Sequence, residues 1–197
     1  MKKVLLASGN QGKLAELQEL FKGLNIELIS QPKDKSYHVE ETGSTFVENA
    51  IIKARHASSL SGLPAIADDS GLIIDALGGE PGVKTARFAG EHASSEENMA
   101  LVLNKMQSFE ALESRQARFV CVLVYIRSAT DPLPLIAIGQ WNGAICQEKQ
   151  GRHGFGYDPI FWCFEENKTA AELNILIKQK YSHRSKASEL LKQQLAE

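Results

Sequence analysis

The stretch VLLASGNQGKLAELQELF, residues 4–21, decides the fold class of this 197-residue chain. Its first four residues are a continuous apolar run, which a serine and a glycine end. Leu14, Leu17 and Phe21 then follow at spacings of three and four, the pattern of one helix face. We therefore predict a buried strand, a glycine turn and an amphipathic helix. With a second short strand at 26–30, they form a β-α-β unit.

Two later helices are indicated by capping boxes, Thr45 with Glu48 and Ser94 with Glu97. The first of them should end before Gly62. Short apolar runs and turn residues predict strands at 65–67, 72–74, 119–126, 135–145 and 159–163, and a last helix from near Ser182. This order predicts an α/β fold with a mixed twisted sheet and flanking helices, residues 1–197 forming a single domain. The long hairpin at 117–146 can form a second lobe, leaving a central cleft.

Composition narrows the class of protein. An apolar content of 43% in 197 residues is enough for one sizeable core. A net charge of -2 argues against a general nucleic-acid or membrane-surface binder, which usually carries a basic excess. Cys121, Cys146 and Cys163 have no C-x-x-C spacing and are interpreted as buried thiols in a reducing compartment. The apolar run at the start is too short for a signal peptide, so we expect a soluble, cytoplasmic protein.

The first candidate site lies at the strand-to-helix turn of the opening unit. Free backbone N–H groups and the helix dipole favour an anion there. Lys13 lies in the first helical turn, where a cation is unfavourable unless an anion is close. An ordinary glycine turn with a solvent-facing lysine is an equally good interpretation, and the Walker A spacing is absent. The candidate residues are Ser8, Gly9, Asn10, Gln11, Gly12 and Lys13.

The second candidate site is a pair of acidic doublets. Glu40 and Glu41 lie in a polar loop, and Asp68 and Asp69 directly follow a short apolar strand. Hard carboxylate oxygens at loop ends are what magnesium binds, with water and phosphate completing its shell. A solvated loop is the plainer interpretation of the glutamates, whereas the flanking apolar residues favour a function for the aspartates.

The helix that begins after Thr45 carries polar residues on the side away from its apolar stripe. Asn49, Lys53 and His56 share that side. Taken by themselves, we interpret these three as a solvent-facing surface.

Two further stretches are candidates for binding a base. The glycine-rich turn at 154–159 holds two aromatic residues and an acid, and can place a ring against a purine. Aromatic residues packed into the core are an alternative there. Ser182, His183 and Arg184 place cationic side chains at a predicted helix start, with Lys178 nearby, which an electron-rich ligand would explain. A lone histidine at such a position is more often structural, and no arrangement indicates a covalent nucleophile or zinc.

Six stretches together resemble the inosine triphosphate pyrophosphatase family, the XTP/dITP diphosphatases, in order and spacing. They are SGNQGK, EETGSTFVENAIIKARHA, PAIADDSG, GGEPGVKTARFAG, HGFGYDPIF and SHRSKA. The match runs from Lys3 to about Leu191. The resemblance implies an elongated α/β fold with a mixed sheet and a central cleft, and a homodimer.

The resemblance also implies roles for the candidate residues. Residues 8–13 look like the triphosphate loop, Lys53 like a further phosphate contact and Ser70 like a substrate contact. Asp69 looks like the general base, Glu40 and Asp69 like magnesium ligands, and Glu41 and Asp68 like supporting acids. The residues that look like the platform for base and ribose are Phe155, Gly156, Tyr157 and Asp158, and those that look like groups closing over the purine are Lys178, His183 and Arg184.

The implied activity is hydrolysis of non-standard purine nucleoside triphosphates (ITP, dITP, XTP) to monophosphate and pyrophosphate. It keeps such nucleotides out of DNA and RNA. Water activated by Asp69 attacks the phosphorus next to the nucleoside, while magnesium and Lys13 neutralise the leaving pyrophosphate. We expect Arg184 to read the purine at its 6-oxygen while Phe155 stacks on the ring.

Two other functions compete with this one. The septum-protein-like pyrophosphatase group looks similar in fold, but its opening loop typically carries Ser and Arg where this chain has Asn10 and Lys13. A catalytically silent nucleotide sensor would not need both acidic doublets, because binding alone requires no base. Release of pyrophosphate separates the enzyme from the sensor.

Overall fold

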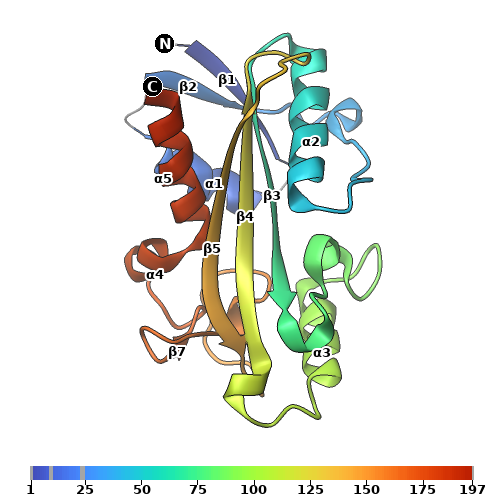
Figure 1. Ribbon diagram of the computed structural model, residues 1–197, viewed down its shortest axis with the longest axis vertical. Coiled ribbons are helices and arrows are strands. Elements are labelled where there is room, and N and C mark those ends of the chain that lie inside the picture. Colours follow the sequence, from blue (N-terminus) through green and yellow to red (C-terminus); the bar gives the residue numbers. More distant parts are fainter. Residues whose placement is uncertain (1, 9–10, 23–24, 197) are drawn as a thin grey trace. The chain divides into compact units, whose positions relative to one another are not determined.

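The sheet of the computed structural model, which describes residues 2–8, 11–22 and 25–196, has the strand order β2-β1-β3-β4-β5-β6-β7 (Figure 1). β1 pairs in parallel with β2 and β3, and β6 pairs antiparallel with β5 and β7. The predicted mixed sheet and the β-α-β opening are therefore confirmed. The strands are β1 (Lys2–Ala7), β2 (Ile26–Ser30), β3 (Ala65–Ile74), β4 (Gln116–Ile126), β5 (Leu135–Ile145), β6 (Phe161–Cys163) and β7 (Lys168–Thr169).

Short-range hydrogen bonds and a glycine set helix ends in this chain. Thr45 and Ser94 each form the predicted capping box, and Gly62, with φ of 68°, ends its helix in the left-handed conformation. No helix of the described residues is long and apolar enough to cross a membrane. The helices are α1 (Gln11–Leu20), α2 (Phe46–Ser61), α3 (Ser95–Lys105), α4 (Ile175–Tyr181) and α5 (His183–Ala196). Short 3-10 turns are η1 (Lys35–Tyr37), η2 (Asp75–Leu77), η3 (Gly82–Arg87), η4 (Leu112–Arg115) and η5 (Asp158–Ile160).

The chain divides into two units, each with its own core. Unit 1 comprises Met1–Asp69, Cys121–Gly139 and Arg184–Glu197, and unit 2 comprises Ser70–Val120 and Gln140–His183. The core of unit 1 joins residues of β1, α1, β3, β4, β5 and α5, and the core of unit 2 is built around buried Trp141 and Phe161. β3 and β5 contribute residues to both units. The central cleft implied by the resemblance stays a prediction.

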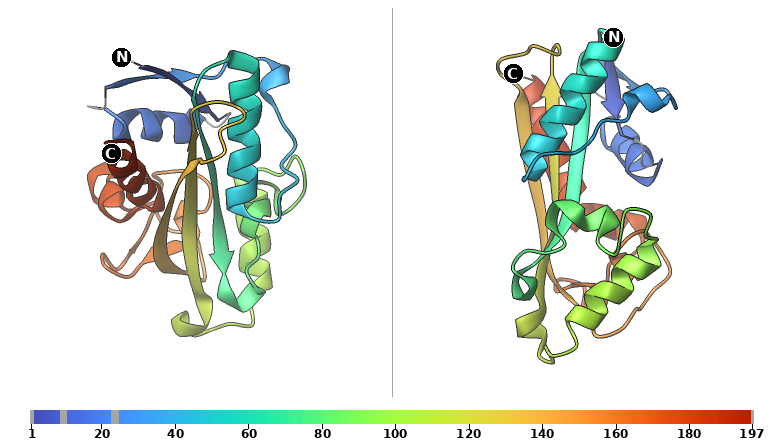
Figure 2. Two further views of the ribbon diagram at one scale, coloured as in Figure 1. Left: turned by 45° about the horizontal axis from the view of Figure 1, so that its top comes forward. Right: turned by 90° about the vertical axis from the view of Figure 1, so that its right-hand side faces the viewer.

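Alternation along the strands of unit 1 produces two buried faces. Val4, Leu6 and Ile66 face the core that contains the apolar side chains of α1 and α5. The alternate strand residues are buried too, and α2 packs on β1 through its buried alanines. In the left view of Figure 2, α1 and α5 lie on one side of these strands and α2 lies on the other. A helix therefore approaches β3 from each face.

One predicted boundary is wrong. The sequence predicts separate strands at 65–67 and 72–74, with Asp68 and Asp69 after a strand end, but β3 is continuous from Ala65 to Ile74. Both aspartates therefore lie in a strand interior. The pattern misled because carboxylates are rare there, and this strand tolerates them only because lysines of other elements reach them. The strand predicted at 159–163 is shorter, because η5 occupies its first residues.

Candidate active site

Two lysines from different helices meet the aspartates of β3 in unit 1. Lys13 Nζ lies 2.7 Å from Asp68 Oδ2. Lys53 Nζ lies 3.0 Å from Asp69 Oδ1 and 2.7 Å from Glu41 Oε1. Successive strand residues point to opposite faces, so Asp68 meets the lysine of α1 and Asp69 meets that of α2. The continuous strand thereby divides the acidic doublet between two lysines.

The two neighbouring carboxyl groups differ in their electrostatics. Burial acts to raise the pKa of Asp68, but Lys13 and Lys53 outweigh it and hold this pKa well below 3.8. For Asp69 burial dominates and raises the pKa above 3.8, with Lys53 opposing it only in part. Asp68 is thus a firmly ionised partner for a cation, whereas Asp69 is the better proton acceptor.

Lys53 is held as a cation by its acidic neighbours. Burial acts to lower its pKa, but Asp69, Asp68 and Glu41 together raise it above 10.5. The expectation that Asn49, Lys53 and His56 form a solvent-facing surface is therefore wrong. Asn49 is fully buried, and His56 donates from Nε2 to the carbonyl oxygen of Ser36 over 2.5 Å. A helical pattern alone could not show that a loop covers this side of α2.

The acids of unit 1 fit magnesium. Asp69 Oδ2 is buried and, within the described residues, has no hydrogen-bond partner. Lys53 leaves this oxygen available, and Glu41 supplies a second hard carboxylate beside the same lysine. No group of three or more His, Cys, Asp or Glu residues among the described residues forms a preformed metal cage. Magnesium needs only one or two carboxylates when water and phosphate complete its shell.

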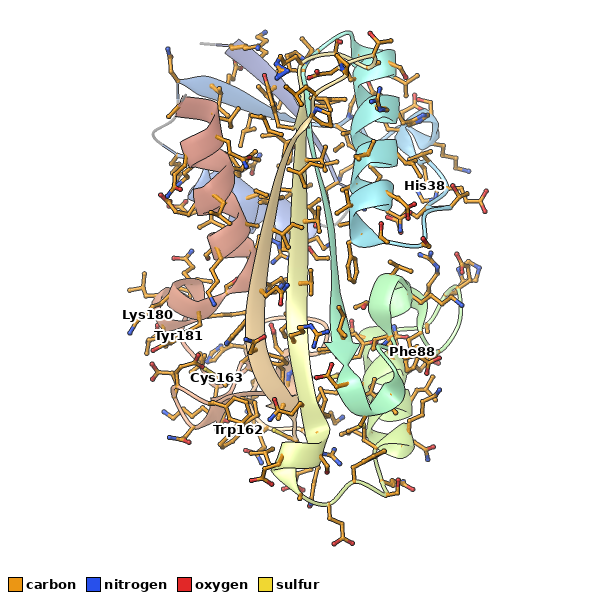
Figure 3. All side chains as sticks on the ribbon, in the orientation of Figure 1. His38, Phe88, Trp162, Cys163, Lys180 and Tyr181 are labelled. Atoms are coloured by element: carbon orange, nitrogen blue, oxygen red, sulfur yellow. The ribbon has the colours of Figure 1, made fainter. Side chains whose placement is uncertain are left out.

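Glu40 and Glu41 are placed differently. Glu40 is exposed, whereas Glu41 is partly buried and contacts Lys53. Both lie in the extended segment that follows His38, which Figure 3 labels near α2. The structure therefore brings Glu41 to Asp69 through Lys53, and the direct binding of a metal by Glu40 stays a prediction.

The predicted phosphate loop is described in part. Ser8 is buried at the end of β1, and Gln11 and Gly12 open α1. Gly9 and Asn10 lie outside the described residues. The anion that Lys13 requires is present in the chain itself, as the carboxylate of Asp68. The alternative of a plainly solvent-facing lysine is thus excluded, and phosphate binding by this loop stays a prediction.

In unit 2 the glycine-rich turn is organised by an acid. Asp158 Oδ2 accepts hydrogen bonds from Phe155 N at 2.9 Å and Lys178 Nζ at 2.5 Å. At Gly154, whose φ is 79°, an added Cβ would lie only 2.0 Å from that oxygen, so glycine is required. Asp158 is buried and holds the turn closed against α4.

The two aromatic residues of this turn have different surroundings. Tyr157 is buried in the core of unit 2, and its hydroxyl donates to the carbonyl oxygen of Thr85 at 2.8 Å. Phe155 is 38% exposed, and Lys178 Nζ lies 5.2 Å from its ring centroid. The core interpretation is therefore right for Tyr157, whereas Phe155 lies at the surface, and its contact with a base stays a prediction.

The residues expected to close over the purine are all buried. Lys178 lies on α4, whose last residues Lys180 and Tyr181 are labelled in Figure 3. His183 belongs to unit 2, where its ring stacks on Phe119 with centroids 4.9 Å apart. Arg184 begins the last segment of unit 1 and forms an ion pair with Glu16 of α1. Ser70 is the unit 2 residue that directly follows Asp69.

Sequence reasoning missed two residues. Glu16 holds Arg184, and its position three residues after Lys13 on the same helix was the available signal. Thr85 lies in the motif GGEPGVKTARFAG, to which no role was given. Its hydroxyl accepts a hydrogen bond from Leu72 N at 2.9 Å and donates one to Gly82 O at 2.6 Å, and its carbonyl oxygen accepts one from the Tyr157 hydroxyl. No periodic pattern marks such a residue, because its partners lie far apart in the chain.

Comparisons with known proteins agree over nearly the whole length. The model of the Ham1 family matches residues 4–194. The chain is 50% identical over 191 residues to a dITP/XTP pyrophosphatase of Vibrio cholerae, covering 97% of this chain and 95% of that protein. It is 50% identical to the enzyme of that name from Escherichia coli strain K12, with 97% and 96% covered.

Solved structures show the same similarity. A HAM1 protein from Coxiella burnetii superposes with a TM-score of 0.92 at 48% identity, covering 100% of this chain and 99% of that one. The Staphylococcus aureus Ham1 protein has a TM-score of 0.87 at 40% identity, with 99% and 98% covered.

Proposed function

This chain belongs to the Ham1 family, and we propose on that premise that it is a hydrolase of non-standard purine nucleoside triphosphates, with ITP, dITP and XTP as substrates. It releases the monophosphate and pyrophosphate and so removes such nucleotides from the pool used for DNA and RNA. The observation in the structure that carries the proposal is the buried Oδ2 of Asp69, which has no hydrogen-bond partner among the described residues, in a cluster that also holds two lysines.

Each residue of the cluster has a chemical task in this proposal. Asp69 takes the proton of the attacking water, and its raised pKa makes it a stronger base than an exposed aspartate. Lys13 and Lys53 bind the triphosphate and balance charge that develops on the leaving pyrophosphate. Water is the nucleophile, so no covalent intermediate with the protein forms.

Magnesium is the proposed cofactor. Asp69 and a glutamate of the Glu40-Glu41 pair would hold it, with Glu41 the better placed and Asp68 as a supporting acid. When bound, it supplies positive charge to the phosphate oxygens. The support is chemical: hard carboxylate oxygens, one of them buried without a partner among the residues described.

The base is proposed to stack on Phe155 and to be read at its 6-oxygen by donors from Arg184 and the neighbouring residues. Adenine presents an amino donor at that position, which would leave buried donors unpaired. Lys178, His183 and the turn at 155–158 complete the purine site. Arg184→Ala should reduce the rate of ITP hydrolysis and bring it closer to the rate of ATP hydrolysis. Phe155→Ala should instead weaken the binding of all purine substrates evenly. If the ratio of ITP to ATP hydrolysis were unchanged in Arg184→Ala, groups other than Arg184 would recognise the 6-oxygen.

The proposal extends to the state of the protein in the cell. We expect a cytoplasmic homodimer that binds neither nucleic acid nor membranes. The net charge of -2 and the three buried free cysteines support this expectation, and the family resemblance supports the dimer. Sedimentation velocity measures the oligomeric state directly.

The deciding experiment is a panel of inosine, xanthosine and the four common nucleoside triphosphates, with and without magnesium, assayed for pyrophosphate. We expect ITP and XTP to be cleaved to pyrophosphate only with the metal, and Asp69→Asn to lower turnover by about 100-fold or more. Release of single phosphates, or turnover near wild type in the Asp69 variant, would contradict the mechanism.

A further inference from the structure

Helices α2 and α3 begin with the same local motif. In each, a capping box is followed directly by a buried asparagine, Asn49 after Glu48 and Asn98 after Glu97. In each, the asparagine Oδ1 accepts a backbone N–H of the preceding loop. Gly43 N lies 2.8 Å from Asn49 Oδ1, and Ala89 N lies 2.7 Å from Asn98 Oδ1. Both asparagines therefore hold a loop against their helix.

The two asparagines differ in the other half of the side-chain amide. Asn98 Nδ2 donates to the carbonyl oxygen of Ala86 at 3.1 Å. Asn49 Nδ2 is also buried, yet nothing among the described residues accepts from it. A buried donor without an acceptor costs about 1–3 kcal/mol, so native proteins keep few of them without a ligand or a role. In α3 the same motif has partners for both halves of its asparagine amide, so the motif by itself does not leave a buried donor unsatisfied.

The unpaired donor lies in the neighbourhood of the acidic cluster. Asn49 precedes Lys53 by one turn of α2, and Lys53 contacts both Glu41 and Asp69. The loop that Asn49 holds carries Glu41 two residues before Gly43. An added Cβ at Gly43 would lie 2.7 Å from Asn49 Oδ1 and 2.6 Å from Glu48 Cβ, so this approach requires glycine.

The rest of the loop is held in the same way. Glu48 Oε2 accepts from Ser44 N at 2.9 Å and Thr45 N at 2.8 Å. Backbone donors of three consecutive residues therefore end on two adjacent side chains of α2. The position of Glu41 relative to Lys53 is set by this short segment.

We propose that Asn49 belongs to the substrate site, with its Oδ1 holding the loop that carries Glu41 and its Nδ2 donating a hydrogen bond to an oxygen of the bound triphosphate. A polyphosphate oxygen is the acceptor of the right chemistry, because it is anionic and the proposed site already gathers Lys13 and Lys53. This inference rests on the proposed function and adds a donor that the family comparison does not assign.

The kinetic test compares matched substitutions. Asn49→Ser removes both halves of the side-chain amide, the Nδ2 donor and the Oδ1 acceptor of Gly43 N, without adding charge. It should raise KM for ITP by about 10-fold or more, since one hydrogen bond to a charged group alone accounts for a change of that size. Asn98→Ser removes a donor that is already satisfied within the protein, so it should lower thermal stability and leave KM unchanged. Equal changes of KM in both variants, or none in either, would overturn the proposal.

A spectroscopic test separates this inference from the proposed function. The side-chain amide signals of Asn49 and Asn98 are followed by NMR in 15N-labelled protein titrated with inorganic tripolyphosphate and magnesium, with magnesium alone, and with inosine. The Asn49 signals should shift with tripolyphosphate only, and the Asn98 signals should not move. A shift with magnesium alone would assign the acceptor to the hydration of the metal, and no shift with tripolyphosphate would remove Asn49 from the site. Either result would overturn the proposal even if the protein hydrolyses ITP, and a shift would support it even if ITP is not the substrate.

Discussion

Asp68 and Asp69 are adjacent in one strand, yet their side chains experience opposite conditions. Asp68 is nearly inaccessible and is held by Lys13, while Asp69 shares Lys53 with Glu41 and keeps one oxygen without a partner among the described residues. The first arrangement stabilises an ion, and the second stores an unfavourable charge that a ligand can relieve. Function and stability are thus separated between two neighbouring residues.

This separation predicts opposite effects of two equivalent substitutions on the ligand-free protein. The lowered pKa of Asp68 means that its charge stabilises the fold above pH 3.8 and that this contribution is lost as pH falls further. The raised pKa of Asp69 means that its charge destabilises the fold above pH 3.8. Asp68→Asn should therefore lower the free energy of unfolding at pH 7, and Asp69→Asn should maintain or raise it.

Urea unfolding of both variants with chelator present, at pH 7 and near pH 3, measures these effects. The two differences from wild type should have opposite signs at pH 7 and should shrink near pH 3. Equal losses at pH 7 would contradict the assigned pKa directions.

Lys13 is predicted to support the fold as well as the substrate. From sequence alone, a lysine at a helix N-terminus without an anion would be neutral or unfavourable for stability. Because Lys13 instead pairs with buried Asp68, Lys13→Ala should lower the free energy of unfolding by about 1–3 kcal/mol at pH 7. Thermal unfolding without ligand checks this, with Lys22→Ala as a control, since the ion pair that the structure describes for Lys22, with Glu19, is exposed. Unchanged stability in the Lys13 variant would mean that the pair is not formed in solution.

At the scale of elements, hydrogen bonds from side chains connect segments that strand pairing does not join. Arg115 is buried and donates from Nε, Nη1 and Nη2 to backbone carbonyl oxygens at the ends of α3 and β5. Its acceptors are Met106 at 2.8 Å, Phe109 at 2.6 Å, Ile145 at 2.5 Å and Cys146 at 2.7 Å. In unit 2 Thr85 joins η3 to β3 and to the turn that carries Phe155. Such ties orient elements that share no strand pairing.

Arg115→Lys should show how much this tie contributes. An ammonium group cannot reproduce the planar fork, so at least one buried carbonyl oxygen loses its donor. We expect the free energy of unfolding to fall by about 2–3 kcal/mol in denaturant titrations. Turnover at a temperature where the variant is folded should stay near wild type, because the described hydrogen bonds of Arg115 all go to carbonyl oxygens outside the proposed site. A loss of turnover without a loss of stability would indicate a different role.

At the scale of the whole molecule, the chain has two hydrophobic cores, one in each unit. Each unit has its own buried cluster, and strands of the sheet contribute residues to both. Small single domains usually unfold in one cooperative transition, whereas larger chains can open in separate cooperative parts. The two units can therefore unfold either in one transition or in two.

The position of the tryptophans allows a test of this cooperativity. The only two, Trp141 and Trp162, both lie in unit 2, so their fluorescence reports on that unit. Leu17 is fully buried in the core of unit 1, and Leu17→Ala should cost about 2–5 kcal/mol. If the units unfold together, the midpoint seen by tryptophan fluorescence and that seen by circular dichroism should fall equally. A fluorescence midpoint that stays at the wild-type value would show independent unfolding.

Much of this protein was determined by local sequence. The β-α-β opening, both capping boxes and the end of α2 at Gly62 follow from short-range preferences of apolar spacing, hydrogen-bonding side chains and a left-handed glycine. The family resemblance likewise depends on six short motifs, and the matched family model confirms it. These features need no knowledge of distant contacts.

Only the tertiary structure decided the roles inside the site. A continuous β3, the assignment of Lys13 to Asp68 and of Lys53 to Asp69, and the burial of Asn49 depend on contacts between segments far apart in the chain. The same is true of Asp158, whose carboxylate holds its own turn and Lys178. Burial and the approach of opposite charges set the pKa of a carboxyl group and the partner of an amide, and neither is a property of local sequence.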